Sequence, residues 1–144
     1  MAEPMRAGIH VEAPPERVFR YFCEPDAMLE WMGDRATLDA VAGGTFAVDV
    51  RGVAVRGEYV TVEPPHRLVF TWGHEGSKEL PPGASVVEVR LTAARGGTNV
   101  VIEHRGLPAS RAPGHDRGWS MFLGRLAAAV ASGPVGEPAP PCTS

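Results

Sequence analysis

The chain has 144 residues and a formal net charge of −3, with 44% hydrophobic and 22% charged residues. That length suits one domain with a sizeable core and is too short for two ordinary ones. The composition is typical of a soluble globular protein. It gives no sign of the basic surface of a nucleic-acid-binding protein or of a charged tail.

The first third of the chain reads as a strand followed by two short helices. Alternation predicts a strand over residues 5–11. The run Pro14-Pro15-Glu16 predicts a helix start, because proline fits the first turn and an acidic side chain favours the positive end of the helix dipole. Pro25 ends this helix, and Asp26 is predicted to cap a second one. Their apolar residues are Val18, Phe19 and Phe22 in the first helix, and Met28, Leu29, Trp31 and Met32 in the second.

From about residue 36 the apolar period changes to two, which is typical of strands. Strands are predicted over residues 37–40, 45–50, 55–63, 67–72, 86–93 and 98–105. Glycine pairs at 43–44 and 96–97 predict tight turns. Pro64 and Pro65 break the chain, since a central strand needs their missing N–H donors. Residues 73–84 are predicted to form a long polar loop.

The strongest helix pattern lies near the end of the chain, at about residues 115–132. Gly133-Pro134 is predicted to end it, and the Pro-rich residues 135–144 are predicted to be disordered. The domain is therefore predicted at residues 1–132, with a tail at 133–144. One continuous apolar face of the helix holds Trp119, Phe122, Leu123, Leu126, Ala127 and Val130.

This order of elements predicts an α+β fold in which a curved antiparallel sheet of six to seven strands wraps around the C-terminal helix. Only that helix remains to cover the apolar face of the sheet, and one helix is about 10 Å wide whereas strands are spaced about 4.8 Å apart. The sheet must therefore curl, with the two short helices closing one end. A hollow between sheet and helix is expected from this geometry.

Several short runs support a family resemblance when taken in order. They are Ala13–Phe19, Gly43–Phe46, Gly57–Val60, Pro64–Trp72, His104–Pro108, Gly118-Trp119 and Leu123–Leu126. Together they resemble the activator-of-heat-shock-ATPase homologue branch of the START-like, helix-grip superfamily, also called SRPBCC. Phe19 departs from the tryptophan usual in that branch. The resemblance implies the fold and a habit of ligand binding, but no single reaction, because the superfamily includes carriers, cyclases, toxin-sequestering proteins and co-chaperones.

The predicted ligand-binding residues are those expected to face the interior. His104 shares a face with Val100 and Ile102, where it could donate to a ligand, act as a weak base, or only bond a backbone carbonyl or helix end. Tyr59 could present its hydroxyl, although a bulge could change its register. The aromatic residues among them could form a wall against a flat ligand, or they could simply pack in the core. The full predicted set is Met28, Trp31, Met32, Phe46, Val48, Tyr59, Phe70, Trp72, Val89, His104, Trp119, Phe122, Leu123 and Leu126.

No catalytic or metal-binding pattern stands out. The chain has no Gly-x-Ser-x-Gly elbow, phosphate loop or dinucleotide fingerprint, and His66 and His74 lack metal spacing. Neither a catalytic residue, a metal nor a cofactor is predicted. Cys23 and Cys142 are interpreted as a buried and an exposed thiol. The charged strand residues, predicted to pair on the wet face, are Asp49, Arg56, Glu58, Glu88 and Arg90.

Three functions remain open. The first is a non-catalytic carrier, sequestering or sensing protein for a hydrophobic or aromatic small molecule. The second is a cyclase or hydrolase acting on a polyketide-like substrate, with His104 and Tyr59 as proton donors. The third, ranked last, is a single-domain regulator of a chaperone ATPase. A homodimer stays open, and the absence of a signal peptide or an apolar span predicts a cytoplasmic protein without nucleic-acid or membrane partners.

Overall fold

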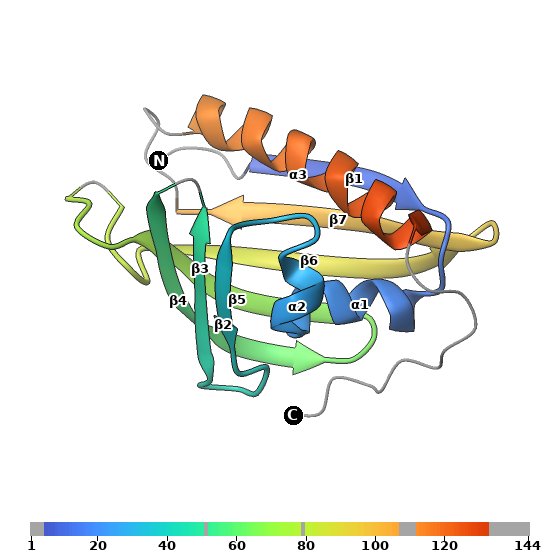
Figure 1. Ribbon diagram of the computed structural model, residues 1–144, viewed down its shortest axis with the longest axis horizontal. Coiled ribbons are helices and arrows are strands. Elements are labelled where there is room, and N and C mark those ends of the chain that lie inside the picture. The colour runs from blue at the N-terminus through green and yellow to red at the C-terminus, as the bar shows by residue number, and fades with distance from the viewer. Residues whose placement is uncertain (1–4, 51, 79, 107–111, 133–144) are drawn as a thin grey trace.

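The computed structural model describes residues 5–50, 52–78, 80–106 and 112–132. Within them the chain forms seven strands and three helices in one antiparallel sheet with helices against its concave side (Figure 1). The predicted α+β helix-grip architecture is confirmed. In chain order the elements are β1 (Met5–Val11), α1 (Pro15–Cys23), α2 (Pro25–Met28), β2 (Arg35–Leu38), β3 (Thr45–Val50), β4 (Val53–Glu63), β5 (Arg67–His74), β6 (Ser85–Ala94), β7 (Gly97–Arg105) and α3 (Ala112–Ser132).

The sheet has the strand order β1-β7-β6-β5-β4-β3-β2, so β1 closes one edge by pairing with the last strand. In Figure 1, α3 runs along β1 and β7; α1 contacts α3, and α2 packs against α1. The strands β2, β3 and β4 run across the direction of β1 and β7, because the sheet twists strongly from one edge to the other (Figure 1). One helix can therefore cover only part of the concave face.

Two irregularities shape the sheet. Between β4 and β5 the register shifts after Tyr59, so that Val60 is an extra residue and the strand bends. Gly57 lies just before this bulge, where a Cβ atom would stand 2.0 Å from the carbonyl oxygen of Thr71. Only glycine allows the two strands to approach so closely.

The structure corrects four local predictions. The helix α2 begins at Pro25 after a Glu24 cap and ends at Met28, so Asp26 is no cap and Trp31 and Met32 lie in the following turn. The segment 73–84 is not wholly a polar loop, because β5 continues to His74 and Leu80 is fully buried. The β6–β7 turn uses Arg95 and Gly96, both at positive φ, and Gly97 already pairs in the strand. The helix α3 begins three residues before the predicted His115.

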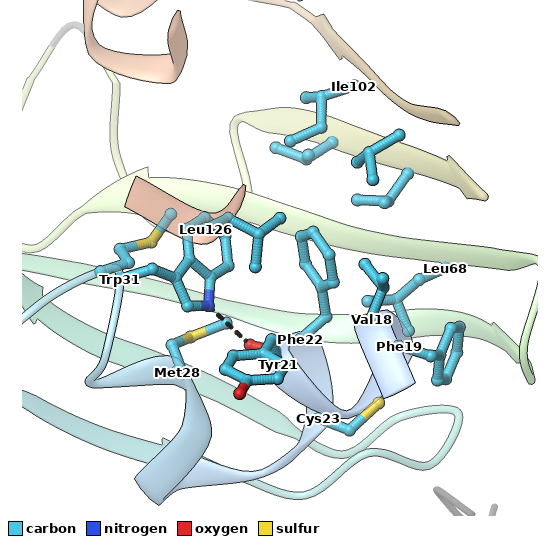
Figure 2. Packing of buried hydrophobic residues seen from close by; sticks show 14 of the residues in the cluster. Val18, Phe19, Tyr21, Phe22, Cys23, Met28, Trp31, Leu68, Ile102 and Leu126 are labelled. Carbon is cyan, nitrogen blue, oxygen red and sulfur yellow. Dashed lines mark hydrogen bonds between the residues drawn. The ribbon is translucent and has the colours of Figure 1, made fainter. Parts of the chain in front are cut away.

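The concave face carries a continuous apolar core. Figure 2 shows Phe22 of α1 and Trp31 packed together, with Leu126 of α3 close above them. All three are at most 1% exposed. Cys23 is the buried thiol that the sequence predicted, whereas Cys142 and the predicted tail lie outside the described residues. The domain boundary at residue 132 stays a prediction.

Candidate functional site

A run of aromatic rings crosses the interior from the sheet to α3. Phe46 of β3 stacks on Phe70 of β5 with 4.1 Å between ring centroids. Trp72, two residues further along β5, lies 5.3 Å from Trp119 of α3. Trp119 in turn contacts the ring of Phe122 at 6.4 Å. Offset and edge-on ring contacts of this kind add to the stability that area burial supplies, so the rings hold α3 against the sheet.

Two polar groups in the interior bind the end of α1. The last carbonyls of a helix have no partner within it. The indole Nε1 of Trp31 donates to the carbonyl of Tyr21 at 2.9 Å (Figure 2). The hydroxyl of Tyr59 donates to the carbonyl of Phe22, also at 2.9 Å. The Tyr59 hydroxyl, predicted as a group for the cavity, therefore serves a helix end in this structure.

A second polar chain lies at the opposite end of the aromatic run, around His104. The hydroxyl of Ser85 donates to the carbonyl of Trp72 at 2.7 Å and lies 2.8 Å from Nε2 of His104. The indole Nε1 of Trp119 donates to Nδ1 of His104 at 3.0 Å. Ser85, His104 and Trp119 are all at most 2% exposed. Both ring nitrogens of His104 therefore bond side chains, whereas the sequence had left a backbone carbonyl or a helix end open as its partner.

These partners determine the tautomer of His104. An indole nitrogen can only donate, so Nδ1 must accept and carries no proton. Ser85 donates its single hydroxyl proton to the carbonyl of Trp72. Its oxygen must therefore accept a hydrogen bond from Nε2 of His104. The ring is thus neutral, with its proton on Nε2 and a lone pair on Nδ1 directed at α3. We infer this assignment from the bonding partners.

The structure brings the predicted ligand-binding residues together in one core. Twelve of them belong to a single buried apolar cluster, and Phe122 packs against it while half-buried. His104 is fully buried beside it, with its ring 5.6 Å from that of Trp72. Whether they line a ligand site stays a prediction. Ser85 was missed, although continuing the inward alternation of Val89 and Val87 by two residues reaches it.

Two open depressions lie elsewhere on the part of the surface that the structure describes. One, of about 590 Å³, lies beside the β4–β5 turn and is lined by Glu63, His66, Arg67, Arg90, Leu91, Thr92 and Ala93. The other, of about 420 Å³, lies between the start of α1 and the β6–β7 hairpin. Neither is lined by any of the predicted ligand-binding residues.

The convex face carries a network of ion pairs. Glu88 of β6 is 5% exposed and bonds Arg67 at 2.7 Å, with Arg105 and Arg90 each at 3.1 Å. The hydrogen bond from Arg67, aided by those from Arg105 and Arg90, lowers the pKa of Glu88 to about 2 against the opposing effect of burial. Of the charged residues predicted as a group to pair across strands, Asp49 pairs with Arg56 at 2.9 Å, whereas Arg90 bonds Glu88 of its own strand. Glu88 differs from the prediction only in being buried by its partners.

Comparison with known proteins shows which family the chain belongs to. Residues 12–131 match the family described as Activator of Hsp90 ATPase homolog 1-like protein. The chain belongs to this family. A curated human relative, Activator of 90 kDa heat shock protein ATPase homolog 1, is 28% identical over 109 residues, which are 75% of this chain. The match spans only 31% of the human protein.

Two solved structures extend the comparison. An AHSA1-like protein from Rhizobium etli is 39% identical with a TM-score of 0.73, covering 90% of this chain and 82% of the other. DynU16, described as a putative protein in the dynemicin biosynthetic locus, is 26% identical with a TM-score of 0.79, covering 92% and 48%. The family resemblance noted from the short runs is thereby confirmed. No helix within the described ranges is long and apolar enough to cross a membrane.

Proposed function

We propose that this protein binds a hydrophobic small molecule with an aromatic part between the concave face of the sheet and α3, as a carrier, sequestering or sensing protein. The observation that carries the proposal is how α3 is attached. Among the described residues, a single side-chain hydrogen bond, from Trp119 to His104, joins α3 to the sheet. Its other described contacts come from apolar residues such as Leu123, Leu126 and Val130, each at most 1% exposed.

Because α3 is held mainly by apolar contacts, a hydrophobic ligand could replace some of them with similar contacts of its own. A flat hydrophobic guest that parts Trp119 and Phe122 from the sheet would replace ring contacts with similar ring contacts. Ligand pockets are mostly apolar with a few placed polar groups, which fits an interior whose polar chain is centred on His104. The name of DynU16, which places it in a biosynthetic locus, also supports a role with a small molecule.

Fluorescence titration with N-phenyl-1-naphthylamine, a neutral two-part aromatic probe, tests this proposal. We expect saturable binding at one site and quenching of tryptophan fluorescence. At a hundredfold excess over the dissociation constant, we expect the melting temperature to rise by about 5 °C or more. Trp119→Leu should change the affinity. Met121→Leu, at a 40%-exposed position on the same helix, is the matched control and should not.

The proposal would be rejected by two results together. One is the absence of saturable binding both for this probe and across a broad library of hydrophobic compounds. The other is an unchanged melting temperature in the same series. Binding that is equally lost in the Met121→Leu control would instead place the ligand on the outside of α3 and would contradict the proposed location.

Regulation of a chaperone ATPase is the second candidate, and the name of the human relative favours it. Adding the purified chain to a 90 kDa heat-shock ATPase and measuring its rate of ATP hydrolysis tests it. An unchanged rate would argue against it. Sedimentation of the same sample checks the homodimer, which stays a prediction.

The cyclase or hydrolase alternative also stays a prediction. It needs His104 to exchange its bonds to Ser85 and Trp119, and Tyr59 to exchange its bond to the Phe22 carbonyl. If His104→Ala left the turnover of an identified substrate unchanged, the assigned role of His104 would be wrong.

A further inference from the structure

Among the described residues, the Nδ1 atom of His104 is a buried polar group that faces α3, and it is an acceptor. The Ser85 hydroxyl holds the proton of His104 on Nε2, which leaves the lone pair of Nδ1 facing Trp119. Turning the ring to present its N–H towards α3 would cost the bond to Ser85, at a position where both side chains are at most 1% exposed. Ser85 thereby determines which hydrogen-bonding partner the site can take.

A guest that enters between the sheet and α3 must break the hydrogen bond between Trp119 and His104. Because this is the one described side-chain hydrogen bond from α3 to the sheet, a guest that separates the two removes the donor from Nδ1. A buried acceptor left without a donor is costly, whereas a guest that brings its own donor restores the bond. Sites built around a buried hydrogen bond therefore discriminate strongly against analogues that lack the matching group.

We propose that His104 selects ligands that carry a hydroxyl or N–H donor on their aromatic part over analogues that offer only acceptors, with Ser85 as the positioning residue. The inference rests on the proposed function and names the chemical class of its ligand. The indole N–H of Trp119 occupies in this structure the place that the ligand donor would take. His104 is thus an acceptor towards the ligand rather than the proton donor that the sequence suggested.

Matched pairs of probes test the selection. 4-Hydroxybiphenyl and 4-methoxybiphenyl both carry an oxygen acceptor, but only the first can donate, and 2-naphthol and 2-methoxynaphthalene form a smaller pair. In equilibrium titrations of the wild-type protein, the hydroxy probe of each pair should have a dissociation constant about 10- to 100-fold lower than that of its methoxy partner. Equal affinities within a pair would overturn the inference while leaving the proposed function standing. Failure of all four probes to bind would count against both.

Three variants separate selection from stability. His104→Asn keeps an acceptor close to the position of Nδ1 and should retain the preference for the hydroxy probes, whereas His104→Leu should abolish it. Ser85→Ala leaves the imidazole in place but frees its tautomer, so the preference should fall while the affinity for the methoxy probes holds. It serves as the test if His104→Leu does not fold. A preference unchanged in Ser85→Ala would remove its positioning role, and one unchanged in His104→Leu would overturn the selection.

Discussion

The two faces of strands β6 and β7 each bury a polar residue, and they stabilise it by different means. On the concave face His104 is uncharged, and the described side chains that its ring nitrogens bond, Ser85 and Trp119, are neutral. On the convex face Glu88 is charged and bonds three arginines that are 39% to 66% exposed. A charge within the aromatic interior would be costly to desolvate, whereas the exposed arginines keep much of their hydration.

This contrast assigns the two faces different roles. The concave face supplies the apolar burial that dominates folding, and its few polar groups are matched in donor and acceptor. The convex face holds opposed carboxylates, since Glu88 and Glu103 are direct partners across β6 and β7. Arg105 bonds both of them, at 3.1 and 2.8 Å, and so offsets the repulsion between like charges. The contribution of the concave face to stability should therefore be insensitive to salt, whereas that of the convex face should be sensitive to both salt and pH.

Truncating a concave ring should have the largest effect. Phe70→Ala removes a side chain that is 1% exposed and stacked on Phe46, so we expect the free energy of unfolding to fall by about 3–5 kcal/mol. Urea denaturation at low and high salt should give the same loss. The matched variant is Val69→Ala, the adjacent residue on the convex side of β5, which should cost less. A loss below about 1 kcal/mol for Phe70→Ala would show that the aromatic run is not the main core.

Neutralising Glu88 should have an intermediate and pH-dependent effect. Its folded pKa of about 2 lies below the ordinary value of 4.5, so the carboxylate stabilises the fold above about pH 4.5 and loses that contribution as the pH falls towards 2. Because solvent screens the exposed arginines, we expect Glu88→Gln to cost about 1–2 kcal/mol at pH 7. The difference from the wild type should shrink towards zero near pH 2.

Urea denaturation at a series of pH values measures this convergence. Glu58→Gln, at an exposed position on β4, is the control and should parallel the wild type throughout. A difference between Glu88→Gln and the wild type that stays constant from pH 7 to pH 2 would show that the side chain acts through packing and not through its charge.

Most of the fold was predicted from two patterns in the sequence: the alternation of apolar and polar residues along strands, and the glycines and prolines that end the strands and helices. The strands β3 and β1 agree with the predicted ranges to the residue, because side chains that alternate between a core and a wet face leave a clear period of two. The short helix α2 was predicted too long, since Trp31 and Met32 are apolar at helical spacing but are buried by a turn. In that case tertiary packing overrode the local pattern.

The sequence predicted which residues lie in the candidate site, but not which hydrogen bonds they make. Inward alternation placed His104 and Trp72 in the interior, where both are buried. The direction of each hydrogen bond depends on which side chains of β6 and α3 meet His104, and no local pattern encodes such a meeting. The same reason explains why Glu88 was placed on the correct face while its burial was missed, since its arginines come from three different strands.

The smallest effect is expected at the edge of the convex network. Arg6 of β1 is 73% exposed and bonds only Glu103 among its described partners, at 2.9 Å. Exposed pairs of this kind contribute little, so Arg6→Ala should change the free energy of unfolding by about 0.5 kcal/mol or less, and high salt should remove the difference. Arg105→Ala is the informative comparison, because Arg105 bonds both opposed carboxylates and should cost more. A loss above about 1 kcal/mol for Arg6→Ala would show that the ion pairs of the convex face act as one coupled network from β1 inward, rather than as a centre at Glu88 with weak outer pairs.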